Sequence, residues 1–450
     1  MQSNEQNSRF WRYLARIFYG FLAFLLVLNL LFPDFSFSSL ENRPLKGLPA
    51  LHWNELVDGK YGQNLESYAS DQFVGRNFMF HVSYVVRKAA GQREINDIFL
   101  GKDALQMQNS LPEQNFLETQ IHAVNQFAGI TQLPCSVLVA PSAATIQPDK
   151  LPPAAPVRDT GPAFDQLYGS LNTQKADVRA VLKEHAAEEI YYKTDHHWTS
   201  LGAKYGAQQL LASLGKEMNW DGFDAMRVSD SFEGTLASRT GSFGLKDDIF
   251  IDPDKNRTDY VVTWADGTKT ASIYDEKALN RKDQYEVFLG KNQSLIHIET
   301  MAESTDNLLL FKDSYANSMV QYLIPYYRNI YIVDPRYYYD EIAYLLSIGS
   351  ISQVAFVFSA DNFFTDRSLQ DILNPFNSAQ LAAQSPQEED GANAEEENVP
   401  PEDNAQSQPE APAEASNESV EQSADSEESS SAESAASQPE DAGSEQNDVA

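Results

Sequence analysis

The densest polar cluster in the chain is Thr194-Asp-His-His-Trp-Thr199. It directly follows the aromatic run 190–192, which we interpret as a short strand ending at Thr194. Because side chains two residues apart share one face of an extended segment, Asp195 and His197 should lie together, and His196 should point away. A carboxylate that orients one ring nitrogen of a histidine leaves the other nitrogen free to act as a base. The spacing therefore predicts an Asp–His pair for proton transfer.

A second polar cluster, Lys312-Asp-Ser-Tyr315, follows the apolar run 308–311 and precedes the segment 316–323, which has helical spacing. A serine at such a strand-to-helix turn lies at the carboxyl edge of a sheet, where the amides of the helix can stabilise a developing oxyanion. Ser314 is therefore a candidate nucleophile, with His197 as the base that a serine hydroxyl needs. Taken alone, however, a serine at a helix start is most often only an N-cap.

Two other kinds of chemistry are weaker alternatives. The two histidines and Asp195, with Glu184 or His185, could bind a metal, although the usual helical spacing of metal-binding histidines is absent. The single cysteine, Cys135, lies in an apolar run typical of a buried strand, where a thiol is normally an inert small hydrophobe. We therefore predict neither a metal nor another cofactor.

The body of the chain alternates between strand-like and helix-like patterns. Besides the segments above, the predicted strands are 136–139, 329–333 and 354–358, and the predicted helices are 113–127, 164–171, 178–184, 200–214 and 339–348. For the helix 200–214, Ser200 is the expected N-cap and Gly215 the C-terminal stop. This alternation predicts an α/β fold, a three-layer sandwich with a mainly parallel sheet. Ligands of such sheets bind at the carboxyl ends of the strands.

Two parts of the body do not follow the alternation. The first, 41–86, is polar and aromatic, and we expect helices and loops packed on the main domain. The second is an insertion at about 216–300. In it, the runs 260–264 and 270–274 flank Asp266-Gly267, which predicts a β-hairpin. We expect the insertion to form part of the rim of the binding pocket.

Near the N-terminus, the run 17–32 is apolar and carries no charge. With its flanking residues it reaches the length that spans a bilayer. Arg9, Arg12 and Arg16 precede it, and such positive flanks stay in the cytoplasm, so the body should lie outside the cell membrane. A cleaved signal peptide is the alternative, but no convincing small-x-small site follows the run.

The charge of the chain is concentrated at the C-terminus. The net charge is −32, and residues 378–450 hold 20 acidic residues and no Lys or Arg. This segment has no aromatic residue and should be disordered, because it cannot bury enough apolar surface. The domains are therefore predicted as 1–35 (cytoplasmic N-terminus and anchor), 36–377 (body) and 378–450 (tail). No basic region stands out, which argues against nucleic acid as a partner.

The motifs resemble those of a known family. Tyr192-Lys-Thr-Asp-His-His-Trp198, followed by Gly202-Ala203, looks like the signature of the DHHW family of bacterial exported proteins. That family is similar to the alginate O-acetyltransferase proteins, which have an SGNH-hydrolase-like fold. Glu41-Asn-Arg43, Gly234-Thr-Leu-Ala-Ser-Arg239 and Lys312-Asp-Ser-Tyr315 with Asn317 also fit the family. The resemblance covers about 39–371.

The resemblance implies roles for individual residues. Asp195 and His197 match the Asp-x-His pair of the relatives, and Ser314 matches their nucleophilic serine. The implied activity is acetyl transfer to or from a cell-envelope polysaccharide, by an O-acetyltransferase or an acetylesterase, with the transferase favoured. A membrane-bound acyl donor protein would be a partner. Ordinary SGNH hydrolases have Gly-Asp before the serine, where this chain has Lys312-Asp313, and the usual oxyanion Gly and Asn find no match.

Substrate contacts are expected from Trp198, Tyr315, Asn317 and Arg239. The first two are aromatic and could stack on sugars, although core packing is the commoner role of such residues. The alternative function is a catalytically inactive glycan-binding or scaffold protein with the same fold. Reactivity of the serine separates the two functions, because a scaffold need not form an acyl-enzyme.

Overall fold

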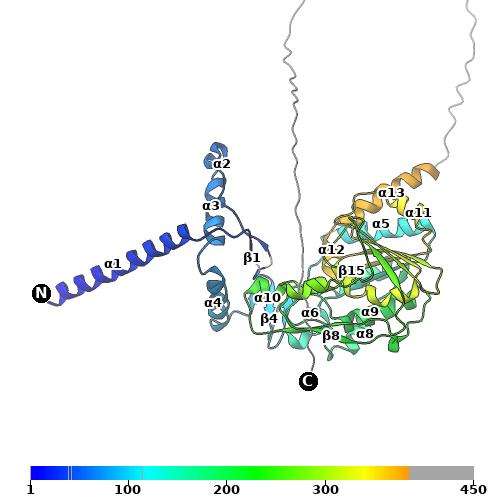
Figure 1. Ribbon diagram of the computed structural model, residues 1–450, viewed down its shortest axis with the longest axis horizontal. Coiled ribbons are helices and arrows are strands. Elements are labelled where there is room, and N and C mark those ends of the chain that lie inside the picture. Colours follow the sequence, from blue (N-terminus) through cyan, green and yellow to red (C-terminus); the bar gives the residue numbers. More distant parts are fainter. Residues whose placement is uncertain (1, 39, 42, 114, 385–450) are drawn as a thin grey trace, which may run out of the picture. The chain divides into compact units, whose positions relative to one another are not determined.

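The computed structural model describes residues 2–38, 40–41, 43–113 and 115–384 (Figure 1). The helices are α1 Gln2–Leu31, α2 Trp53–Val57, α3 Lys60–Asp71, α4 Arg76–Ala89, α5 Phe116–Thr131, α6 Ala143–Ile146, α7 Gly161–Ser170, α8 Arg179–Glu184, α9 Ser200–Ser213, α10 Thr235–Thr240, α11 Ile342–Ile348, α12 Ala360–Thr365 and α13 Ser368–Gln384. The strands outside the central sheet are β1 Phe37–Ser38, β2 Arg43–Pro44, β3 Glu94–Ile95, β4 Ile98–Leu100, β5 Leu105–Met107, β8 Met226–Phe232 and β9 Asp247–Ile251.

An eight-stranded sheet forms the centre of the body. Its strands, in spatial order, are β11 Lys269–Thr270, β10 Tyr260–Thr263, β12 Leu295–Thr300, β14 Asn329–Val333, β13 Asn307–Lys312, β15 Gln353–Ser359, β6 Cys135–Ala140 and β7 Gln174–Lys175. Neighbours from β14 to β7 run parallel, whereas β14, β12, β10 and β11 pair antiparallel. The predicted α/β fold with a large, mainly parallel sheet is confirmed.

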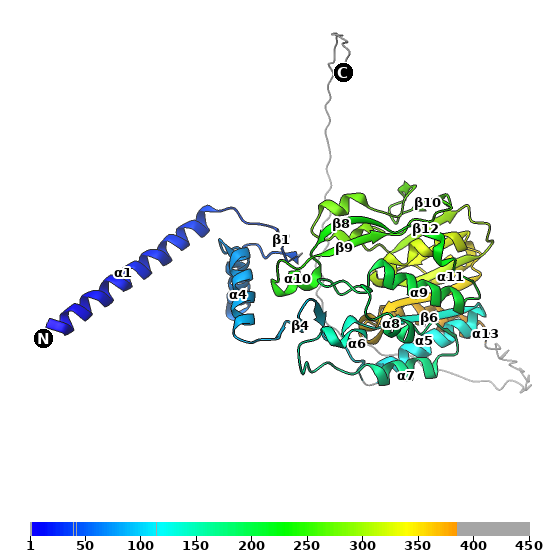
Figure 2. The same cartoon turned by 90° about the horizontal axis from the view of Figure 1, so that it is seen from below.

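Helices cover both faces of this sheet. Alternate residues of β15 enter two separate apolar cores, Ala355 and Val357 in one, Val354 and Phe356 in the other. The first core also holds residues of α8 and α9, and the second holds residues of α5, α7, α11 and α13 (Figure 2). Burial on both faces explains why the central strands appear in the sequence as unbroken apolar runs.

The insertion does two different things. Its predicted hairpin exists as β10 and β11, and this hairpin extends the central sheet, because β10 pairs with β12. The earlier part of the insertion, α10, packs with β3–β5, where Leu236 and Ala237 are buried. Only this earlier part lies at the binding pocket, as described below.

The predicted strand 190–192 is wrong. This segment pairs with the far end of its own loop, through a bridge between Tyr191 and Trp198. Tyr192 N donates to His197 O (3.2 Å), and Thr199 N donates to Ile190 O (3.0 Å). The aromatic residues are buried and strand-like in type, but their backbone groups are satisfied locally and not by the sheet.

Two helix predictions also need correction. The segment 316–323 contains the 3₁₀ helices η5 Ser314–Ser318 and η6 Val320–Tyr322, where an α-helix was expected. The N-cap of α9 is Thr199 and not Ser200, since the Thr199 hydroxyl accepts from Gly202 N (3.3 Å). Gly215 has φ +77°, a conformation that suits the residue after a helix end.

Among the described helices in the first part of the body, α4 packs on the main domain in the expected way. Tyr84 is buried with residues of α10, and a ring nitrogen of His81 lies 2.8 Å from Gly241 O. By contrast, α2 buries none of its residues and α3 buries only Asp71. Asp71 accepts two hydrogen bonds from Arg43, of the Glu41-Asn-Arg43 segment.

At the N-terminus, α1 contains a 23-residue segment, Arg9–Leu31, that is long and apolar enough to span a membrane. At the other end, α13 continues to Gln384, past the predicted start of the tail at 378. Ala, Gln and Leu at 379–384 are good helix formers, which an argument from low hydrophobicity overlooks. Residues 385–450 of the predicted tail lie outside the described residues.

A buried ion cluster supports the strand before Ser314. The Lys312 ammonium lies 3.3 Å from Asp334, and both side chains are fully buried. Arg336 also binds Asp334, with distances of 2.8 and 2.7 Å. Burial lowers the pKa of Lys312, so its charge depends on Asp334.

Substituting the acidic member and the lysine of this cluster should lower the free energy of unfolding by unequal amounts. Asp334→Asn should lower the free energy of unfolding by about 3–5 kcal/mol, because it leaves Lys312 buried without a counter-ion. Lys312→Met should cost much less, since Arg336 still neutralises Asp334 and Met fills the space. Denaturant unfolding of the full chain in detergent measures both, and equal losses would contradict this account.

Candidate active site

Asp313 fixes the turn that presents Ser314. It follows β13 as the N-cap of η5, and its Oδ1 accepts from Tyr315 N (2.9 Å). Its Oδ2 accepts from Ser359 N (2.8 Å), Ser359 Oγ (2.6 Å) and Asn362 Nδ2 (2.7 Å). These bonds tie the ends of β13 and β15 together, so Ser314 is held at the carboxyl edge of the sheet.

Asp195, His197 and Ser314 form a continuous hydrogen-bonded chain. Asp195 Oδ1 lies 2.6 Å from His197 Nδ1, and His197 Nε2 lies 2.8 Å from Ser314 Oγ. Asp195 and His197 are both buried. The arrangement has the geometry of a nucleophile, a base and a carboxylate that orients the base.

Asp195 and His197 meet for a different reason from the one predicted. The segment 195–197 is not extended. Asp195 Oδ1 also accepts from His197 N (3.0 Å), which forms a tight turn closed by the aspartate side chain. The same oxygen therefore holds both the backbone and the ring of His197, and the two-residue spacing serves a turn and not a strand face.

Thr235, the first residue of α10, hydrogen-bonds the second oxygen of Asp195. Oδ2 accepts from Thr235 N (2.7 Å) and Thr235 Oγ1 (2.9 Å). Burial alone would raise the pKa of Asp195, but the neighbouring histidines and these hydrogen bonds outweigh it and hold the pKa below its ordinary value. The carboxylate is therefore ionised at neutral pH, as an orienting group must be.

Gly234 allows the backbone before α10 to approach Asp195 closely. A Cβ added to Gly234 would lie 2.4 Å from both Cβ and Oδ2 of Asp195. The φ of Gly234 is −80°, which any residue can adopt, so contact with Asp195 and not backbone strain demands glycine here.

Gly234→Ala should therefore displace Asp195 and reduce activity by about 10²-fold, the loss expected for a misplacement of about 1 Å at a reacting group. Initial rates of ester cleavage measure the effect. Gly129→Ala, on α5, is the matched control, because a Cβ there meets nothing within 4 Å. Normal activity of the Gly234→Ala protein would show that the aspartate has room to move.

Two further residues support the site, and nothing in the sequence indicated either of them. Asp247, on β9, accepts from Lys193 N (2.7 Å) and Thr194 N (2.8 Å). These bonds anchor the start of the segment 193–198, called the histidine loop below. Tyr285, on η4 Gln284–Val287, stacks on the His197 ring with centroids 3.9 Å apart. Its hydroxyl donates to Ser314 O (3.0 Å), so one side chain contacts both His197 and Ser314.

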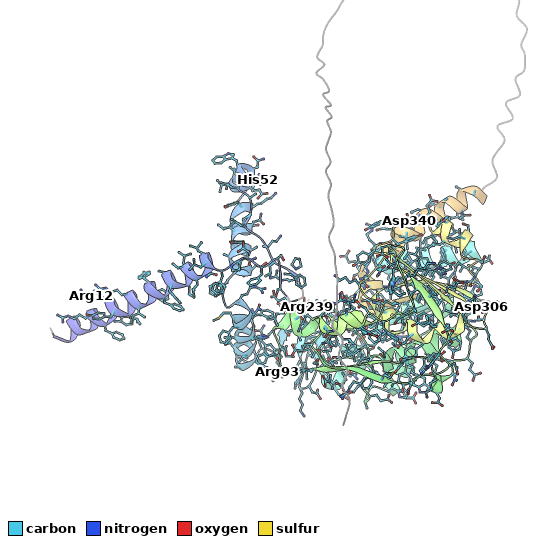
Figure 3. All side chains as sticks on the ribbon, viewed as in Figure 1. Arg12, His52, Arg93, Arg239, Asp306 and Asp340 are labelled. Carbon is cyan, nitrogen blue, oxygen red and sulfur yellow. The ribbon has the colours of Figure 1, made fainter. Side chains whose placement is uncertain are left out.

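A cavity of about 280 Å³ opens over Ser314. The residues around it come from β5 and the loop after it, α6, α10, the histidine loop and α12; they include Asn109, Ser142, His196, Thr235, Arg239 and Asn362. Of the four residues predicted to contact substrate, Arg239, labelled in Figure 3, and Tyr315 line this cavity. The other two candidates do not. Trp198 is fully buried, with Nε1 donating to Tyr315 O (2.8 Å), and Asn317 is also buried and away from the cavity.

The cluster of Asp195, His196 and His197 could also be considered for a metal, since its ligand atoms lie within 4.8 Å of one another. However, both oxygens of Asp195 and both ring nitrogens of His197 are engaged in the hydrogen bonds given above. Only one nitrogen of His196 has no partner among the described residues. The donor set therefore favours proton transfer over metal binding.

Comparison with known proteins agrees with the motifs. A family model described as DHHW protein matches residues 162–333, which include Asp195, His197 and Ser314. No curated protein matches the chain.

Three solved structures are similar. A DHHW family protein from Eubacterium siraeum has a TM-score of 0.54 and 22% identity, covering 61% of this chain and 97% of that one. Bacillus cereus PatB1 with a sulfonyl adduct has a TM-score of 0.52 and 20% identity, covering 60% and 97%. The O-acetyltransferase domain of Pseudomonas putida AlgJ is more distant, with a TM-score of 0.39 and 12% identity over 64% and 100%. At such identities the first two show a shared fold, and the predicted resemblance of this chain to the DHHW family is confirmed.

Proposed function

We propose that this chain transfers an acyl group through Ser314, His197 and Asp195, as an enzyme of SGNH-hydrolase type. The observation that carries the proposal is the hydrogen bond of 2.8 Å between Ser314 Oγ and His197 Nε2, backed by the buried Asp195. An isolated serine hydroxyl is a weak nucleophile, and this arrangement supplies the base that activates it.

The reaction would proceed in two steps. In the first, Ser314 Oγ bonds to the acyl carbon while its proton passes to His197 Nε2, and the leaving group departs with that proton. In the second, a hydroxyl of the acceptor attacks the acyl-enzyme and gives its proton to His197. The bond from the acyl carbon to Oγ then breaks, and Oγ recovers its proton. Asp195 stabilises the imidazolium in both steps and stays ionised.

The substrates proposed are an acetyl group and a cell-envelope polysaccharide, with a sugar hydroxyl favoured over water as acceptor. Support comes from the DHHW motif and from the open cavity over Ser314, which combines a charged residue, Arg239, with amide and hydroxyl groups. A membrane-bound acyl donor protein is the proposed source of the acetyl group.

The proposed location of the body is outside the cell membrane. The support is the apolar segment Arg9–Leu31 of α1 with its basic N-terminal flank, which stays in the cytoplasm when such a segment is an uncleaved anchor. The anchor, 1–35, would then hold the body beside substrates of the cell envelope.

The test of the function is intact-protein mass spectrometry after incubation with an activated acetyl ester. We expect a mass increase of one acetyl group, located on the peptide that contains Ser314. A sulfonyl fluoride is a second probe, because it traps an activated serine without turnover. If neither reagent modifies Ser314 in the folded protein, the glycan-binding alternative becomes the better account.

A further inference from the structure

His196 occupies a place that the proposed mechanism does not use. The sequence predicted that it points away from the site, but its side chain lines the same cavity as Ser314 and is 31% exposed. Its ring centroid lies 3.9 Å from that of His197. Its Nδ1 lies 2.8 Å from Thr235 Oγ1. The cavity therefore holds a second imidazole beside the first.

The hydrogen bonds of Thr235 decide which nitrogen of His196 carries the proton. Thr235 has one hydroxyl proton, and its Oγ1 lies 2.9 Å from Asp195 Oδ2, an ionised oxygen that can only accept. That proton therefore goes to Asp195. Thr235 Oγ1 must then accept from His196, which places a proton on Nδ1.

The other nitrogen of His196 is consequently a lone-pair acceptor. His196 Nε2 has no hydrogen-bond partner in the part of the chain that the structure describes. Burial, together with the nearby His197, lowers the pKa of His196 to about 4, so the ring is neutral at pH 7. A neutral ring accepts a hydrogen bond at Nε2, and with so low a pKa it is a much poorer base than an ordinary imidazole.

We propose that His196 Nε2 binds a second hydroxyl of the acyl acceptor, next to the hydroxyl that attacks the acyl-enzyme. The proposal rests on the proposed function and narrows its substrate class. The attacking hydroxyl gives its proton to His197, while the neighbouring hydroxyl donates to His196 and keeps its proton. Two adjacent imidazole acceptors thus suit a pair of vicinal hydroxyls, as in a sugar, better than a simple alcohol or water.

The test compares two acceptors that differ by one hydroxyl, trans-1,2-cyclohexanediol and cyclohexanol. The full-length protein in detergent is acetylated with an activated ester in the presence of both at equal concentration. The acetylated products and free acetate are then quantified by chromatography. We expect the wild-type protein to favour the diol by about tenfold, the ratio that one additional hydrogen bond provides.

Two variants test the roles of the two ring nitrogens of His196 separately. His196→Asn can keep the donor to Thr235 but has nothing at the position of Nε2, so it should lose the preference for the diol. His196→Gln can place an amide oxygen near that position and should keep part of the preference. The readout in both is the ratio of the two acetylated products, which is set after the acyl-enzyme has formed, so a change in the rate of acylation does not alter it.

The outcomes distinguish the inference from the function on which it rests. A wild-type protein that forms the acyl-enzyme but prefers neither acceptor, or only hydrolyses it, overturns the role of His196 and leaves the triad in place. Retention of the full preference in the His196→Asn protein also overturns it. A wild-type protein that forms no acyl-enzyme overturns the proposed function and this inference together. The wild-type comparison needs no variant, so misfolding of a variant does not remove the test.

Discussion

Replacing Ser314 with alanine should reduce the rate of acyl-enzyme formation by about 10⁴-fold or more, the size of loss that follows removal of a nucleophile from a serine triad. No other hydroxyl is held by His197, whose Nε2 is bonded to Ser314 Oγ alone in the described structure. Pre-steady-state release of the leaving group from an activated acetyl ester measures this rate directly.

The same substitution should leave the fold nearly unchanged. Ser314 Oγ makes one hydrogen bond, to His197, and the backbone of the turn is held by Asp313 and Tyr285. The free energy of unfolding should therefore change by no more than about 1 kcal/mol. Ser347→Ala, on the exposed side of α11, is the control and should retain full activity. Rapid acylation of the Ser314→Ala protein would assign the chemistry to another residue.

The sequence was sufficient to predict that Asp195, His197 and Ser314 lie together, because each of them lies beside a strong local signal. The strand β13 appears as the apolar run 308–311, and its end marks Ser314. The spacing of Asp195 and His197 was informative even though its structural cause was misjudged, since a side-chain-closed turn and a strand both bring residues i and i+2 together.

The residues that support the triad could not be found in the same way. Gly234, Thr235, Asp247 and Tyr285 all lie well beyond the histidine loop, on separate elements or turns of the insertion. Each is a common residue type, and its role arises only from contacts across the fold. Although Gly234 and Thr235 belong to the segment that resembles the family, the resemblance alone did not indicate contact with Asp195.

The errors in secondary structure have a related cause. The run 190–192 has strand-forming residues, but tertiary contacts bury it as one arm of a loop. The α10 segment of the insertion enters the pocket, whereas its hairpin joins the sheet. Local pattern predicted the hairpin but not α10, and it did not indicate which surface either of them covers.

Replacing Asp195 with asparagine should reduce acylation by about 10⁴-fold, because the imidazole then loses its orienting carboxylate. The structure also predicts a cost in stability. One oxygen of Asp195 accepts from His197 N and the other from Thr235 N, and both of these backbone groups can only donate. An asparagine amide has one oxygen, so in either orientation its NH₂ group faces a donor. The free energy of unfolding should fall by about 1–3 kcal/mol, the penalty for an unsatisfied buried donor.

The control for this second effect is Asp247→Asn. Asp247 also accepts from two backbone groups, Lys193 N and Thr194 N, with one on each oxygen, but it does not touch His197. It should lose a similar amount of stability with a far smaller loss of acylation.

The pH dependence of stability gives an independent check. Because the pKa of Asp195 is lowered from 3.8, its ionised form stabilises the fold above pH 3.8, and this contribution disappears as the pH falls through the lowered value. The Asp195→Asn protein should lack that part of the acid dependence in unfolding experiments. Wild-type acylation by the Asp195→Asn protein would show that His197 needs no carboxylate, and the chain of three hydrogen-bonded residues would then not be the catalytic device.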